Sequence, residues 1–364
     1  MTLSKVHRER NGNPCFIDRH QRKRAEVARG MRVIVYSETG PSSVLRLVER
    51  PDPAPGPGEV VVRIVRAGVN PADWGFRAAP GPVDGELAPG QDGAGFVEAA
   101  GPGVDHVAVG DRVWLLLAQQ GHGYGTASEL TVQPAHRVVP LPESASFDLG
   151  AALGVPFLTA HRLLTSGSVT RLGPAALAGQ TVLVAGGAGA VGNAAIQLAR
   201  WAGARVIATV SSSTKARLAR AAGAHHVLNY RESDPAPEIL GIAPGGVDLI
   251  AEVAPAQNNA LDLAVAKIHG TVSIYADNGG DTLTLPLRET YRKNLRYQFT
   301  VLHSLDTALL RAAIDDVSSA LTERALRVGE DAGLPLHHYS LEQTAAAHDA
   351  VEQGAIGKVL LDLK

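Results

Sequence analysis

A glycine-rich loop between an apolar run and an alanine-rich segment constrains the fold more than any other feature of this sequence. Residues 181–185 (TVLVA) are typical of a buried strand, and residues 193–200 (NAAIQLAR) are typical of a helix. The intervening glycines have the spacing G-x-G-x-x-G. Such glycines let the backbone approach a pyrophosphate, and the helix N-terminus attracts its charge. The alternative is a glycine-rich turn in another α/β fold. The loop predicts a dinucleotide site formed by Gly187, Gly189, Ala190, Val191 and Gly192.

The next strand-like run indicates which dinucleotide is bound. Residues 206–210 (VIATV) lead into Ser211, Ser212 and Lys215, and no acidic residue follows until Glu232. An acid there would hold the ribose hydroxyls of NAD, whereas hydroxyls and one lysine can donate hydrogen bonds and countercharge to a 2′-phosphate. The sequence therefore favours NADPH. The same serines could also cap a helix, and the two roles can coexist.

The sequence pattern divides the chain into regions with different expected secondary structure. Residues 31–157 contain short strands and turns, and after residue 160 short apolar strands alternate with helical segments, which predicts a parallel doubly wound sheet. Residues 1–30 hold eight Lys or Arg against three acids and lack the apolar core of a secretory signal. We expect them to be a disordered basic extension or an upstream start-site artefact; the alternative is an arm that docks on an anionic partner.

Composition excludes several classes of protein. A single cysteine, Cys15, excludes a disulfide framework and a multi-cysteine zinc site. Nearly balanced charge (34 basic and 36 acidic residues) and few aromatics argue against nucleic-acid binding. No apolar run approaches the roughly 18–20 residues of a membrane span. We expect a cytoplasmic protein that acts on a small molecule.

Several stretches, in order, resemble one enzyme family. They are residues 67–74 (AGVNPADW), 89–95 (PGQDGAG), 109–114 (VGDRVW), the glycine loop, 223–231 (GAHHVLNYR) and 357–361 (GKVLL). Together they resemble the zinc-independent, zeta-crystallin-like quinone oxidoreductases of the medium-chain dehydrogenase/reductase superfamily. The resemblance implies an α/β fold with two domains. A GroES-like β-rich catalytic domain would comprise residues 31–157 and 304–364, and a Rossmann doubly wound parallel-sheet domain would comprise residues 158–303, with the active site in the cleft between them.

The resemblance also implies that no metal takes part. Zinc-dependent members of the superfamily have a cysteine where this chain has Asn70, and a His-Glu pair where it has Gln91 and Asp92. No cysteine follows Cys15, and no histidine pair shows the spacing of a metal site. Acceptors that delocalise the added charge, namely quinones and α,β-unsaturated carbonyls, need no Lewis acid. Their pocket is expected from the loops 76–87 and 117–124.

The site residues follow from the same resemblance. Asn70 should lie near the nicotinamide, and Asp73 and Trp74 should shape the substrate pocket; their structural alternatives are a turn, a helix cap and a core aromatic. A second group should contact the cofactor: Thr159, Tyr230, Tyr275, Ala276 and Lys358, in addition to Asn70. Thr159 could instead cap a helix.

The hypothesis is an NADPH-dependent oxidoreductase that transfers hydride to quinones without zinc. One alternative is an NADPH-dependent enoyl or alkene reductase acting on an α,β-unsaturated carbonyl, such as a secondary-metabolite tailoring enzyme. Another is a low-turnover NADPH-binding protein, because fold alone does not determine function. The resemblance implies a homodimer, formed through residues 294–302, and does not exclude a tetramer. The natural acceptor and the choice between one- and two-electron transfer stay open.

Overall fold

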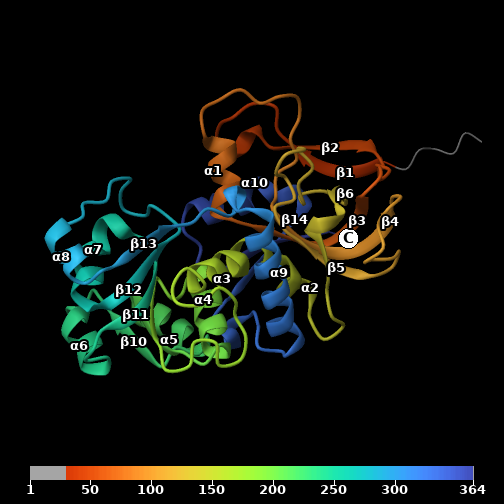
Figure 1. The fold of residues 1–364 in the computed structure, drawn as a ribbon. Coiled ribbons are helices and arrows are strands. Elements are labelled where there is room, and N and C mark those ends of the chain that lie inside the picture. The colour runs from red at the N-terminus through yellow and green to blue at the C-terminus, as the bar shows by residue number, and fades with distance from the viewer. Residues whose placement is uncertain (1–29, 364) are drawn as a thin grey trace, which may run out of the picture.

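The computed structural model describes residues 30–363. The predicted extension of residues 1–30 lies outside the described residues except for Gly30, which begins the first strand. Figure 1 shows two sheets side by side, the β-rich part on the right and the parallel sheet with its helices on the left. No helix of residues 30–363 is long and apolar enough to cross a membrane.

The β-rich part is built on a seven-stranded sheet in the order β14-β15-β3-β4-β5-β7, with β6 paired to β3. All its pairings are antiparallel except β14 with β15. A separate hairpin joins β1 to β2. The strands are β1 (Gly30–Val35), β2 (Arg46–Pro51), β3 (Glu59–Val69), β4 (Asp92–Ala100), β5 (Arg112–Leu115), β6 (Leu130–Pro134), β7 (Val138–Pro140), β14 (Leu336–Ser340) and β15 (Lys358–Asp362).

Six parallel strands form the second sheet in the order β10-β9-β8-β11-β12-β13. Numbered from β8, this is the order 3-2-1-4-5-6 of dinucleotide-binding doubly wound sheets, so the predicted Rossmann domain is confirmed. The strands are β8 (Thr181–Ala185), β9 (Arg205–Val210), β10 (His226–Asn229), β11 (Val247–Glu252), β12 (Ala266–Ile274) and β13 (Arg296–Phe299).

Within residues 30–363, ten α-helices accompany the two sheets. They are α1 (Pro71–Ala78), α2 (Phe147–Ala152), α3 (Leu158–Leu164), α4 (Ala190–Trp201), α5 (Ser213–Ala221), α6 (Pro235–Ile242), α7 (Pro255–Val265), α8 (Leu287–Arg292), α9 (Thr307–Thr322) and α10 (Thr344–Glu352). A π-helical turn, Leu153–Phe157, joins α2 to α3. Short 3-10 turns occur at Ser42–Val44, Ala135–Arg137, Leu302–Ser304, Glu330–Ala332 and Leu341–Gln343.

The chain crosses between the two sheets twice. It leaves the β-rich sheet after β7, builds the parallel sheet from β8 to β13, and returns to pair β15 with β3. The return brings residues near the end of the chain beside residues near position 70, because Val359 pairs with Val69. The domain boundaries at residues 157/158 and 303/304 stay a prediction.

Candidate active site

The glycine loop joins β8 to α4 in a conformation that only glycine permits at two positions. A Cβ atom on Gly192 would lie 2.3 Å from the carbonyl oxygen of Gly186, and one on Gly187 would lie 2.8 Å from the Cβ of Ala208. A Cβ on Gly189 would meet only the oxygen of Gly186, at 3.5 Å. Gly187 and Gly192 therefore allow close helix–strand packing, and Gly189, the N-cap of α4, leaves open space for a phosphate.

A cavity of about 200 Å³ opens beside this loop. It gathers residues that the sequence predicted as cofactor contacts: Gly189, Ser211, Lys215, Tyr230 and Tyr275. The Lys215 Nζ donates to the Ser211 hydroxyl at 3.2 Å, and the Ser212 hydroxyl caps α5 by accepting from the Lys215 backbone N–H at 3.3 Å. One serine thus takes the capping role that the sequence allowed, and the other lies beside a cation at the cavity.

Four polar side chains form a buried cluster at the ends of three adjacent strands. Asn70 follows β3, Asp92 begins β4 and Lys358 begins β15. The Asn70 Nδ2 donates to Asp92 Oδ2 at 2.8 Å, and the Lys358 Nζ donates to Asn70 Oδ1 at 2.7 Å and Asp92 Oδ2 at 3.2 Å. Asp92 Oδ1 accepts from the Val155 backbone N–H at 2.7 Å. The ammonium of Lys358, which was predicted to face the cofactor, is thus engaged within the cluster.

Asp73 is the fourth member of the cluster. Its Oδ2 accepts from the Asn70 backbone N–H at 2.7 Å, which is the helix-capping role weighed as its alternative. Its Oδ1 has no hydrogen-bond partner within residues 30–363. Burial, reinforced by the nearby Asp92 carboxylate, raises the pKa of Asp73 to about 7. Asp73 is therefore a group whose charge changes near neutral pH.

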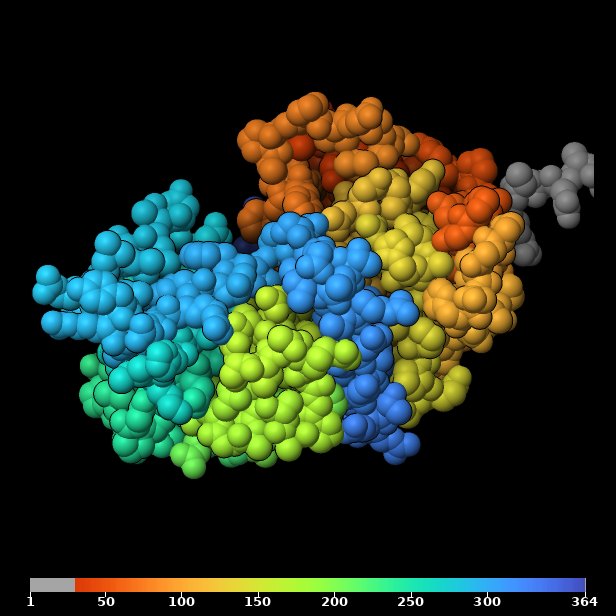
Figure 2. Space-filling model, viewed as in Figure 1, coloured from red at the N-terminus to blue at the C-terminus, as the bar shows by residue number. Residues whose placement is uncertain are grey.

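A second cavity, of about 300 Å³, lies beside α1. Residues from both predicted pocket loops line it, including Phe76 and Gln119. The opposite wall is His303, from the segment that follows β13, and the rings of Phe76 and His303 meet edge to face with centroids 5.0 Å apart. Figure 2 shows the orange segment around α1 facing the blue segment that follows β13 across the boundary between the domains. The cavity therefore lies between the two domains, where the active site was expected.

Polar side chains connect across this cavity. The Gln119 Nε2 donates to the Tyr36 hydroxyl at 2.8 Å, and the Gln91 Nε2 reaches Gln119 Oε1 at 3.4 Å. Gln91 Oε1 and His303 Nε2 are buried and have no hydrogen-bond partner among the described residues. Tyr36 and His303 also line this cavity and were not predicted as pocket residues. The available signal was the position of His303, just after the last parallel strand, at the edge of the sheet where ligands bind.

The remaining predicted residues lie elsewhere. Trp74 is half-buried on α1 and does not line the cavity to which its neighbour Phe76 contributes. Thr159 is buried inside α3, whose N-cap is Phe157, so its alternative role as a helix cap is wrong. Ala276 follows Tyr275 and is half-buried. Contacts of Trp74, Thr159 and Ala276 with a ligand stay predictions.

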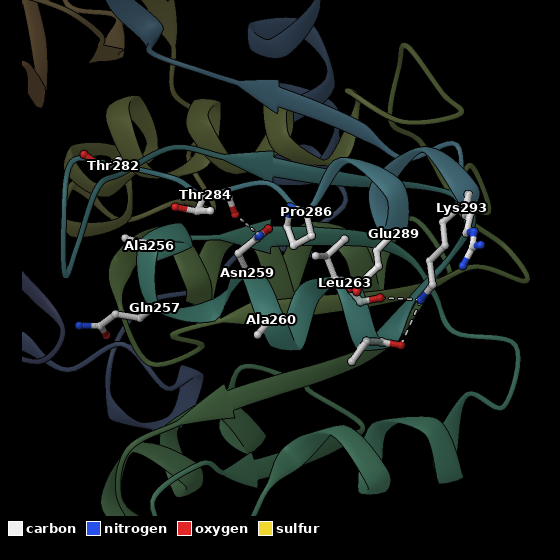
Figure 3. A pocket seen from close by; sticks show the side chains of 12 residues that line it. Ala256, Gln257, Asn259, Ala260, Leu263, Thr282, Thr284, Pro286, Glu289 and Lys293 are labelled. Carbon is white, nitrogen blue, oxygen red and sulfur yellow. Dashed lines mark hydrogen bonds between the residues drawn. The ribbon is translucent and has the colours of Figure 1, made fainter.

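A further cavity of about 610 Å³ lies between α7 and the segment that leads into α8 (Figure 3). None of the predicted site residues lines it. The Asn259 Nδ2 donates to the Thr284 carbonyl at 2.8 Å, and the Lys293 Nζ donates to the carbonyls of Leu263 and Ala264 at 2.5 and 3.2 Å. Because these polar groups already have partners, the cavity is a weaker candidate for a site.

Comparison with known proteins agrees with this architecture. Residues 56–143 match the family model "Alcohol dehydrogenase GroES-like domain", and residues 190–319 match "Zinc-binding dehydrogenase". A quinone oxidoreductase from Lama guanicoe is 32% identical over 340 residues, which cover 92% of this chain and 98% of that protein. The human quinone oxidoreductase is 30% identical over 339 residues, which cover 91% of this chain and 97% of that protein.

A solved structure extends the comparison to three dimensions. The Escherichia coli quinone oxidoreductase complexed with NADPH is 26% identical and superposes with a TM-score of 0.75, covering 91% of this chain and all of that one. Fold, domain content and sequence identity over nearly the whole length agree. The chain is therefore an oxidoreductase that belongs to the quinone oxidoreductase group of the medium-chain dehydrogenase/reductase superfamily.

Proposed function

We propose that this protein is an NADPH-dependent oxidoreductase that transfers hydride to quinones without zinc. The observation that carries the proposal is the cavity of about 300 Å³ beside α1, lined by residues of the β-rich domain and by His303 at the carboxyl edge of the parallel sheet. Ligands of doubly wound sheets bind at that edge. The volume lies at the small end of ligand pockets and suits a planar acceptor of one or two rings.

The residues of the cavity beside the glycine loop suit the pyrophosphate and the phosphorylated ribose of NADPH. Gly189 leaves space at the N-terminus of α4 for the pyrophosphate, and Ser211, Lys215 and Tyr230 would surround the 2′-phosphate. When bound, NADPH supplies a hydride from C4 of the nicotinamide. The protein contributes proximity, orientation and shielding from water.

The residues present do not fit the zinc that one of the matched family models names. The cluster offers an amide, Asn70, and the carboxylate of Asp92 together with the ammonium of Lys358, whose Nζ is 2.7 Å from Asn70 Oδ1 and 3.2 Å from Asp92 Oδ2. A zinc ion prefers thiolate, imidazole and carboxylate ligands, and an ammonium in their midst repels it. Within residues 30–363 no group of three or more His, Cys, Asp or Glu could hold a metal ion. We therefore favour acceptors that delocalise the charge brought by hydride.

The first test titrates NADPH and NADH while nicotinamide fluorescence is followed, and then adds 1,4-benzoquinone or an enone. Tight binding of NADPH, weak binding of NADH and quinone-dependent oxidation would support the proposal. Lys215→Glu should remove the preference for NADPH, because it replaces the cation beside Ser211 with an anion. Arg217→Glu is the control, since Arg217 is exposed on the same helix and does not line the cavity.

Other results of the same experiment would support one of the two alternative functions. Reduction of the enone to a saturated carbonyl, without oxidation by quinones, would favour the enoyl reductase. Binding of NADPH with no acceptor reduced would favour the low-turnover protein. Failure of both nucleotides to bind would refute the cofactor site itself.

The proposal includes a homodimer in the cytoplasm. The support for a dimer is the edge strand β13, which within residues 30–363 pairs only with β12. Its last residue, Phe299, and the nearby Val301 have exposed fractions of 60% and 57%. Unpaired strand edges with apolar side chains are typical pairing surfaces.

A further inference from the structure

His303 lines the acceptor cavity and carries a ring nitrogen without a hydrogen-bond partner among the described residues. The side chain is half-buried, and its Nε2 is fully buried without a hydrogen-bond partner among the described residues. A buried polar atom without a partner destabilises the folded protein, because its hydrogen bond to water has been lost and not replaced. A ligand that forms a hydrogen bond with Nε2 removes this cost, so the cavity favours ligands with a polar atom at that point.

The ring is held in place from two sides. Phe76 of α1 meets it edge to face, with an interplanar angle of 86°. The backbone carbonyl of His303 accepts from the Gln120 Nε2 at 2.7 Å, and the preceding residue, Leu302, is buried. The imidazole is therefore positioned before any ligand arrives, which is a requirement for an effective catalytic donor.

The other polar groups of the cavity complement this nitrogen. Gln91, only 1% exposed, has a buried Oε1 without a described partner, and the Tyr36 hydroxyl already accepts from Gln119. The cavity thus offers one unpaired nitrogen and one unpaired amide oxygen. A carbonyl oxygen that becomes a hydroxyl during the reaction matches this pair, because it first accepts a hydrogen bond and afterwards donates one.

The surroundings keep the imidazole neutral. Burial lowers the pKa of His303, the Arg137 guanidinium acts in the same direction, and the Asp92 carboxylate opposes both. Arg137 itself donates to the carbonyls of Leu117 and Gln120. A neutral imidazole carries one N–H and can polarise a carbonyl without losing charge.

We propose that His303 is the proton donor of the reaction: its Nε2–H binds the acceptor's carbonyl oxygen and passes its proton to that oxygen. Hydride adds to the conjugated carbon skeleton, and the carbonyl electron pair moves to the oxygen. The oxygen–hydrogen bond forms as the Nε2–H bond breaks. Nδ1 takes a proton from water, so the ring stays neutral as the other tautomer and the hydroxide goes to solvent. The inference rests on the proposed function and assigns the residue that completes it.

The test compares His303→Leu and His303→Gln with the wild type. His303→Leu should lower kcat for 1,4-benzoquinone by about 100-fold, at the lower end of what proton transfer by a positioned side chain contributes. His303→Gln keeps an N–H donor but cannot relay a proton, so its kcat should lie between those of the wild type and His303→Leu. The dissociation constant for NADPH should stay within about twofold in both variants, because His303 does not line the cofactor cavity. The solvent deuterium isotope effect on kcat should disappear in His303→Leu.

His348→Gln is the matched control. His348 is buried and also carries an unpaired ring nitrogen, Nδ1, but it lies on α10 and does not line this cavity. It should leave kcat and the isotope effect unchanged.

A readout independent of turnover uses 1,4-hydroquinone as the probe. Its binding to the protein loaded with NADP⁺ should shift the ¹⁵N resonance of one imidazole. The same resonance should be absent from the spectrum of His303→Gln, which lacks that ring. Should His303→Leu fail to fold, His303→Gln and this resonance carry the test.

The outcomes separate two failures. An active wild type with His303 variants of unchanged kcat, or with no shifted resonance, overturns the role of His303 alone. A wild type that oxidises NADPH with neither quinones nor enones overturns the proposed function, and the role of His303 with it.

Discussion

Replacing Lys358 with methionine should test whether the buried cluster depends on its ammonium. The Lys358 side chain is 2% exposed and that of Asp92 is 0% exposed. Without the ammonium, Asp92 keeps two donors, Asn70 Nδ2 at 2.8 Å and the Val155 N–H at 2.7 Å, but it becomes a buried, uncompensated charge. Asn70 Oδ1 loses its donor as well. Removing one partner of a buried ion pair lowers the free energy of unfolding by about 3–5 kcal/mol. Because Asp92 keeps two hydrogen-bond donors, we expect a loss at the lower end of this range, about 3 kcal/mol.

The assay is urea unfolding followed by tryptophan fluorescence and circular dichroism, since two domains need not unfold in one step. The double variant Asp92→Asn/Lys358→Met removes both charges and should be more stable than Lys358→Met alone. The resulting coupling energy should reach about 2 kcal/mol, within the range for residues in one network. Lys267→Met is the control: its ion pair with Asp248, at 2.7 Å, involves a side chain that is 49% exposed and should contribute at most about 1 kcal/mol.

Two results would refute this reasoning. A loss below about 1 kcal/mol for Lys358→Met, equal to that of the control, would mean that the ammonium does not compensate a desolvated carboxylate. A double variant as unstable as the sum of the single variants would mean that Lys358 and Asp92 act independently.

Three further predictions follow from single contacts. Gly192→Ala should abolish NADPH binding in a fluorescence titration, because its Cβ would lie 2.3 Å from the Gly186 oxygen, whereas Gly241→Ala, with no atom within 4 Å, should bind NADPH normally. Phe299→Glu should convert the proposed dimer to a monomer in light scattering; a dimer that persists would assign the interface elsewhere. Asp73, whose pKa is raised to about 7, binds more protons folded than unfolded between about pH 4 and 7. The free energy of unfolding should therefore fall as pH rises through this range, and urea titrations of Asp73→Asn at pH 5 and 8 should show a smaller fall; an unchanged fall would contradict the shifted pKa.

The parallel sheet could be predicted because its signals are local. The apolar run of residues 181–185, the glycines that follow it and Lys215 lie within about 35 residues, and their roles depend on short-range geometry. The buried cluster was predicted only in part. Asn70 was singled out by resemblance, but its bond to Lys358 joins residues 288 positions apart and has no local pattern.

The acceptor cavity was likewise predicted only in part: the loops 76–87 and 117–124 were expected to line it, but Tyr36 and His303 were not. Its walls come from the segments around Tyr36, Phe76, Gln119 and His303, and their shapes depend on how the two domains pack. The alternative role of Thr159 as a helix cap was wrong for another reason. The π-helical turn Leu153–Phe157 connects α2 directly to α3, so Thr159 lies inside a continuous helical segment and not at a helix start.

The pairing of β15 with β3 has a consequence for synthesis on the ribosome. β3 is eleven residues long and is made early, but β15, which covers residues 66–69 of one edge of β3, is made only after the whole parallel sheet. The domain that begins first is thus completed last, and the parallel-sheet domain can fold while its partner still exposes an open strand edge. That edge is a point at which nascent chains can pair wrongly, so chaperones that shield strand edges should act on this protein between residues 70 and 358 of its translation.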